Sequence, residues 1–142
     1  MSTIFTKIID GEIPGRFVWS DESVVAFLDV RPQTTGHVLV VPRREVDRWT
    51  EAEPDLLEKV MRVAQAIGHA QVQVFGSARA GLTVMGFEVP HLHVHVWPVN
   101  SMADYDFAHP QGATDDESLD AAAGSLREAL RRAGHGDAVP TD

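Results

Sequence analysis

Short runs of apolar, β-forming residues separated by polar turns fill the first third of the chain. Residues 16–19 and 24–28 flank a Ser-Asp-Glu turn and predict a hairpin. A third strand is expected at residues 37–41, where Pro42 stops it. Before the hairpin, residues 4–10 predict a short helix or turn.

From Asp55 onward the apolar positions take up a helical period. They keep to one face and predict a helix of about five turns that starts near Pro54. Residues 81–85 then predict a strand, and residues 91–97 predict the most regular strand of the chain.

The rest of the chain predicts an irregular segment followed by a helix. Residues 99–112 carry Asn, Asp, Pro and Gly without a period. A helix is expected from about residue 117 to residue 132, with Thr114 and Glu117 forming a capping box at its start.

This order of elements predicts an α+β fold with an antiparallel sheet of about five strands, one long helix and a C-terminal helix. No repeat or linker divides residues 1–142, so we expect a single domain. Residues 1–100 carry its core, and residues 101–142 form the irregular segment and the C-terminal helix.

Composition excludes several classes of function. The formal net charge of −9 argues against binding to nucleic acid, which needs a basic surface. The chain has no cysteine, so disulfides, thiol catalysis and cysteine-ligated zinc are excluded. We find neither an apolar stretch of the ~20 residues that span a membrane nor a secretory signal, so no membrane association is predicted and a cytoplasmic location is expected.

Three histidines alternate with apolar residues in His91-Leu92-His93-Val94-His95. With 7 histidines in 142 residues, such a triplet is expected by chance roughly 0.02 times. On a strand, alternate side chains share a face, so the imidazoles would form a row with steps of ~6.7 Å.

Three interpretations of this row are open. The histidines could be solvated side chains on an exposed strand face. They could bind a metal ion, with Glu88 or His37 as a further ligand. They could also act on phosphorus, because imidazole is largely neutral and nucleophilic near pH 7 and can form a covalent intermediate.

The triplet and three further segments resemble the histidine triad (HIT) family. The motif His-Leu-His-Val-His-Val-Trp fits the pattern of histidines alternating with apolar residues that defines this family. The other similar segments lie in the family's order along the chain, at residues 4–14, 26–32 and 36–43. The resemblance implies a HIT-like fold and a symmetric homodimer that uses the long helix and the strand at 81–85, with no cofactor and no metal.

The resemblance also implies roles for four histidines. His93 is expected to be the nucleophile, and His95 to contact the phosphoryl group and assist the leaving group. His91 and His37 are expected to form a hydrogen-bonded relay that holds the tautomer.

For the substrate, the resemblance implies that Asp29 binds the ribose hydroxyls. Apolar side chains would wall a purine base: Ile4, Phe5, Ile8, Phe27 and Leu28. Val89 could offer its backbone N–H to the phosphate, whereas Glu88 stands where a small hydroxyl residue would help to hold it.

The predicted function is hydrolysis of purine nucleoside phosphoramidates through a nucleotidyl-histidine intermediate. The alternatives are hydrolysis of diadenosine polyphosphates, nucleotide binding with little turnover, and a metal site ligated by histidines. The carboxylate of Glu88 has two possible roles. It could act on selectivity, because a negative charge near the phosphate repels compact polyphosphates, or it could simply point to solvent.

Overall fold

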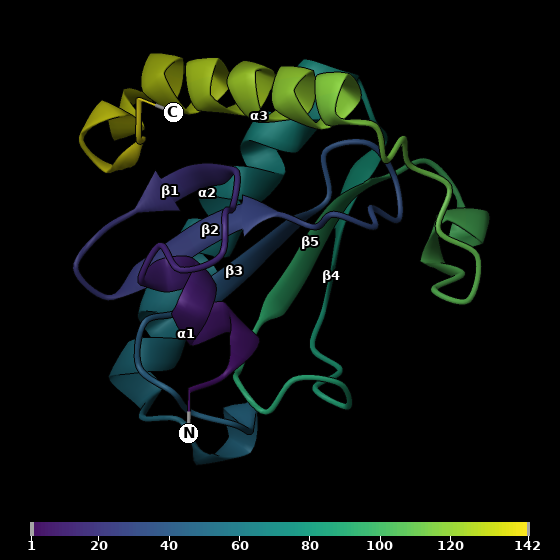
Figure 1. The fold of residues 1–142 in the computed structure, drawn as a ribbon. Helices are drawn as coiled ribbons and strands as arrows, with labels where there is room; N and C mark the ends of the chain where they lie inside the picture. The colour runs from purple at the N-terminus through teal and green to yellow at the C-terminus, as the bar shows by residue number, and fades with distance from the viewer. Residues whose placement is uncertain (1, 142) are drawn as a thin grey trace.

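A computed structural model describes residues 2–141. These residues form a five-stranded antiparallel sheet with the strand order β1-β2-β3-β5-β4 (Figure 1). The strands are β1 Phe17–Ser20, β2 Val24–Leu28, β3 Val38–Pro42, β4 Arg79–Thr83 and β5 Val94–Val99. The predicted α+β fold and five strands are therefore confirmed.

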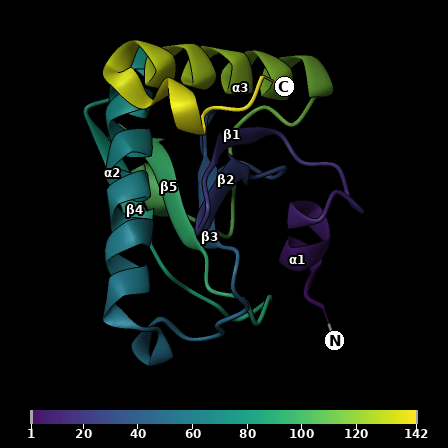
Figure 2. The same cartoon turned by 90° about the vertical axis from the view of Figure 1, so that its left-hand side faces the viewer.

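Helices lie on both faces of this sheet. Figure 2 shows the long helix α2 along one face, the short helix α1 on the opposite face, and α3 across one end. The helices are α1 Ile4–Ile9, α2 Pro54–Phe75 and α3 Asp116–Leu130, with short helical turns at Trp49–Glu51, Met102–Tyr105, Arg131–His135 and Gly136–Ala138. No helix within residues 2–141 is long and apolar enough to cross a membrane.

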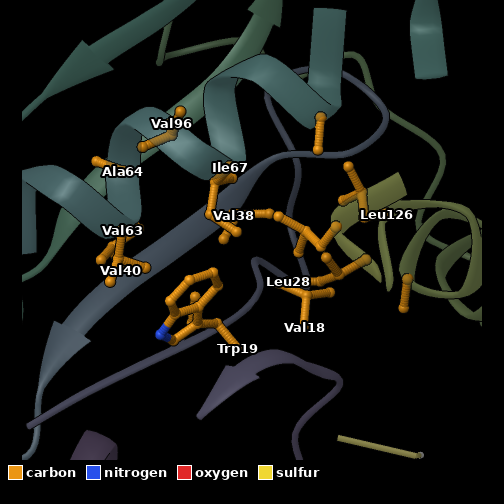
Figure 3. Close-up of a cluster of buried hydrophobic side chains, with 14 of the residues drawn as sticks. Val18, Trp19, Leu28, Val38, Val40, Val63, Ala64, Ile67, Val96 and Leu126 are labelled. Atoms are coloured by element: carbon orange, nitrogen blue, oxygen red, sulfur yellow. The ribbon is translucent and has the colours of Figure 1, made fainter. Parts of the chain in front are cut away.

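The main core lies between the sheet, α2 and α3. Val38, Val40 and Val96 meet Val63 and Ile67 of α2 there (Figure 3). A fully buried Val, Leu or Ile side chain stabilises the fold by about 1.5–3 kcal/mol, so this layer dominates stability.

A second, smaller cluster lies on the opposite face of the sheet. Phe5 of α1 packs there against Phe27 and Leu39. Because both faces are covered, every residue of β2, β3 and β5 is buried. His95 lies opposite Leu39 in the β3–β5 register, on the face that α1 covers.

Several element boundaries differ from the prediction. The strand predicted from His91 begins only at Val94, because the Leu92 N–H bonds to the carbonyl of Val46 and so does not extend a strand ladder. Helix α2 has 22 residues, about six turns, and ends at Gly76, whose φ of 63° closes it in the left-handed region.

The predicted strand at residues 81–85 lies two residues earlier, at Arg79–Thr83. The cap of α3 also differs from the prediction. Asp115, and not Thr114, is the N-cap residue, and its carboxylate accepts from the Ser118 N–H.

Candidate active site

Four chain segments bring the predicted site residues to one cleft of about 860 Å³ on the α1 face of the sheet. Asp29 directly follows β2, His37 directly precedes β3, and His95 lies on β5. The predicted residues that line the cleft are Ile4, Phe5, Ile8, Phe27, Leu28, Asp29, His37, Glu88, Val89, His93 and His95.

His37 and His95 form a hydrogen-bonded pair whose direction the backbone fixes. The Gln33 N–H donates to His37 Nδ1 at 2.9 Å, so the hydrogen of a neutral His37 lies on Nε2. That Nε2–H donates to His95 Nδ1 at 3.0 Å. The hydrogen of a neutral His95 is therefore on its Nε2.

His93 has the complementary tautomer. Its Nδ1 lies 2.7 Å from the His91 carbonyl oxygen, which can only accept, so Nδ1 carries the hydrogen. Nε2 of His93 then keeps a lone pair. The ring packs edge-on against Phe5, with 4.8 Å between the centroids, and lies 5.1 Å from the ring of His95.

His91 does not take part in the predicted relay with His37. Its Nε2–H donates to the Pro42 carbonyl at 2.7 Å, and its Nδ1 accepts from the Thr3 hydroxyl at 2.8 Å. The ring is fully buried and does not line the cleft. Because His91 precedes β5, it lies outside the predicted row and supports His93 through its backbone carbonyl.

Burial keeps the imidazoles of the cleft neutral near pH 7. Desolvation, with a contribution from the neighbouring His95, lowers the pKa of His37 to about 3. Desolvation and the neighbouring His93 lower the pKa of His95 to about 4, and burial also lowers the pKa of His93. These shifts fit a site that works with uncharged imidazoles.

Asp29 is the carboxylate closest to this pair. Its Oδ2 lies 3.8 Å from His37 Nε2, and its Oδ1 accepts from the Arg31 N–H at 2.9 Å. Burial raises the pKa of Asp29 above its ordinary value. The Arg31 N–H is bound by Oδ1, which leaves Oδ2 to accept hydrogen bonds from a ligand.

The sequence did not indicate several residues that line the cleft. Arg16 comes from the segment before β1 and forms ion pairs with Asp116 and Asp120 of α3, at 2.9 and 2.7 Å. Phe107 lies in the segment that was predicted to be irregular. Phe107 shares this segment with Met102 and Tyr105, so no local signal singled it out, and nothing local pairs Arg16 with α3.

A metal ion fits this site poorly. The possible ligand atoms of Asp29, His37 and His95 lie within 4.8 Å of one another. However, the Gln33 N–H occupies the lone pair of His37 Nδ1, so Nε2 carries a hydrogen and could bind a metal only as an imidazolate. The site is therefore built as a hydrogen-bonded histidine pair and not as a set of metal ligands.

Comparison with known proteins identifies relatives of this site and fold. The family model "HIT domain" matches residues 10–102. An uncharacterized HIT-like protein from Methanocaldococcus jannaschii is 38% identical over 102 residues, which are 67% of this chain and 77% of the relative.

Two solved structures share the fold over nearly the whole chain. A Zn-bound histidine triad family protein from Mycobacterium smegmatis has a TM-score of 0.80 at 25% identity and covers 96% of this chain and 98% of its own. A hypothetical histidine triad nucleotide-binding protein from Sulfolobus tokodaii has a TM-score of 0.75 at 26% identity, over 91% and 92% of the two chains. With the domain match and the triad geometry together, the chain belongs to the HIT family.

Proposed function

We propose that this protein hydrolyses purine nucleoside phosphoramidates, with His93 forming a covalent nucleotidyl intermediate. The fixed tautomer of His93 carries the proposal. Its Nδ1–H is held by the His91 carbonyl, and its Nε2 keeps a lone pair in a residue that lines the cleft. A neutral imidazole with a free lone pair is a good nucleophile near pH 7.

The nucleoside would occupy the apolar part of the cleft beside α1. Phe5, Ile8 and Phe27 would contact the base, and the free Oδ2 of Asp29 would accept from the ribose hydroxyls. The S. tokodaii relative, which is described as nucleotide-binding, supports a ligand of this class.

In the proposed reaction, His93 Nε2 attacks the α-phosphorus and the P–N bond breaks. The substrate reacts in its nitrogen-protonated form, P–NH2R⁺, so the nitrogen takes the P–N electron pair and leaves as a neutral amine without a proton from the protein. Water then attacks the phosphorus, the Nε2–P bond breaks, and a nucleoside monophosphate is released while the second proton of the water passes to solvent.

His95 would stabilise the phosphoryl group by donating a hydrogen bond from Nε2–H. Transfer of that proton to the leaving group would leave an imidazolate, unless His37 supplied its own proton and became anionic beside Asp29. The directed chain from Gln33 therefore favours hydrogen bonding by His95 over net proton transfer.

The charges in the cleft favour phosphoramidates over polyphosphates. Of the two arginines that line it, Arg16 is already paired with Asp116 and Asp120. Asp29 and Glu88 add two more carboxylates. A compact, highly charged diadenosine polyphosphate would meet repulsion there, whereas an amine leaving group adds no negative charge.

The test is His93→Ala, assayed for release of AMP from adenosine 5′-phosphoramidate. Turnover should fall by about a thousandfold or more, while AMP binding measured by calorimetry stays within about threefold of the wild type. His69→Ala, on the exposed side of α2, is the matched control and should leave both unchanged. Near-normal turnover by the His93 variant would refute the assignment, and an inactive wild type that binds AMP would favour a binding module.

A further inference from the structure

Residues 101–112 form a strap between β5 and α3 (Figure 1). Its Phe107 ring lies beside the rings of His37 and His95. The indole N–H of Trp97 donates to the Asp104 carbonyl at 2.8 Å and holds the first part of the strap. The side-chain amide of Gln33 donates to the Asp106 carbonyl at 2.7 Å and holds its middle. The strap is thus tied both to β5 and to the loop between β2 and β3.

Its far end is anchored just as closely. The Gly112 N–H donates to the Pro32 carbonyl at 3.0 Å, and the Gln111 N–H donates to the Gln33 carbonyl at 3.1 Å. A Cβ on Gly112 would lie 2.7–2.9 Å from atoms of Pro32, so the close approach requires glycine. Gln33 therefore binds the strap with its side chain and carbonyl while its N–H sets the tautomer of His37.

Phe107 is the large apolar side chain of the strap that turns inward. Met102 and Tyr105 are 81% and 40% exposed, whereas Phe107 is half-buried and lines the cleft. Its ring stands edge-on to His95 and His37, with centroid distances of 5.7 and 6.3 Å.

We propose that Phe107 is a positioning residue of this site, which closes the His37–His95 pair to water and keeps it in the neutral, directed hydrogen-bonded form. Only the expected effect of Phe107 on turnover rests on the proposed function. The ring touches the two imidazoles from the side of the strap, and the sheet covers them from behind. Without the ring, water could solvate either imidazole and compete for the single hydrogen bond that joins them.

The neighbouring imidazole of His93 also disfavours protonation of His95, but the carboxylate nearest to the pair acts in the other direction. Asp29 faces His37 from the end of β2 and would favour a protonated imidazole. On the strap, Asp106 is exposed and bonded to His109 at 2.9 Å. Exclusion of water therefore has to outweigh the attraction of Asp29, and Phe107 is the strap side chain placed to provide it.

The experiment compares Phe107→Ala, Phe107→Leu and Met102→Ala in the chain of residues 1–142. Imidazole protonation is followed by NMR against pH in the absence of substrate, so the result does not depend on turnover. In F107A the pKa values of the pair should rise towards 6.5 by about one unit or more, with a smaller rise in F107L. M102A, which removes an exposed side chain from the same strap, should not shift them.

Turnover of the phosphoramidate gives a second measurement. We expect kcat to fall about tenfold or more in F107A and to recover partly in F107L, with AMP affinity unchanged. Unchanged titration of the pair in F107A, or an equal shift in M102A, would overturn the proposal. If F107A does not fold, a titration of F107L that matches the wild type would overturn it as well.

Discussion

The buried His37–His95 pair should make the fold sensitive to acid. Both imidazoles have lower pKa values in the folded protein, about 3 and about 4, than the ~6.5 of an unfolded chain. Between these values the unfolded state binds more protons than the folded state. Stability is therefore fully present above pH 6.5 and is lost as the pH falls towards the folded pKa values.

The size of the loss follows from this difference. Each group changes the free energy of unfolding by ~1.4 kcal/mol per pH unit within its window. At pH 4.5 the two groups together remove on the order of 5 kcal/mol, against a total stability of about 5–15 kcal/mol for an ordinary domain. As the pH falls from 6.5, the protein should therefore lose much of its stability before the pH reaches 4.

Urea unfolding followed by tryptophan fluorescence at pH 7.5, 6.5, 5.5 and 4.5 measures this slope. His37→Gln removes one titrating group, so its slope should be shallower than that of the wild type by ~1.4 kcal/mol per pH unit. The raised pKa of Asp29 makes the folded state more stable as the pH falls, which opposes the effect of the histidines. Because this contribution is present in both proteins, the difference between their slopes isolates the contribution of His37. His69→Gln, at an exposed position on α2, is the control. Equal slopes for the wild type and H37Q would refute the reasoning.

Three further predictions concern the substrate, metal ions and assembly. Glu88→Gln should lower kcat/KM for a phosphoramidate with a cationic amine, relative to one with a neutral amine, because it removes a carboxylate that attracts the cation in the cleft. Because Glu88 is exposed, the effect should be only a few-fold. An equal effect on both substrates would exclude a role of Glu88 in choosing the leaving group. Activity should survive exhaustive dialysis against a chelator, because the Gln33 N–H leaves His37 unsuited to bind a metal; loss of activity with recovery on adding Zn²⁺ would contradict this. A homodimer is expected through α2 and the edge strand β4, where Met61 and Leu82 are 47% and 44% exposed beside a groove. Leu82→Glu should then give a 15.6 kDa monomer in sedimentation at micromolar concentration. A monomeric wild type would refute the dimer.

The sequence by itself determined the elements whose signals are local. The helical period from Asp55 located α2 and its start near Pro54, although the helix is about one turn longer than predicted. The hairpin of β1 and β2 is found where it was predicted, although Ser20 belongs to β1 and the turn consists of residues 21–23. The triad motif also indicated the family, which the domain match confirms. These features depend on residues that lie close together in the chain, so a pattern of a few positions is sufficient to predict them.

Only the tertiary structure decided which histidines work together. His37 and His95 are 58 residues apart, and they meet because the β3–β5 register places Val38 opposite Val96. The His91 ring does not join His93 and His95 in the cleft, because the Leu92 N–H bonds to the Val46 carbonyl and the regular strand begins only at Val94.

Phe107 reaches the same pair for a similar reason. The side chain of Gln33, far from it in sequence, ties down the strap that carries it. Contacts of this kind depend on strand register and on hydrogen bonds between distant segments. Periodicity and turn chemistry carry no information about them, so the site could be assembled only from the folded chain.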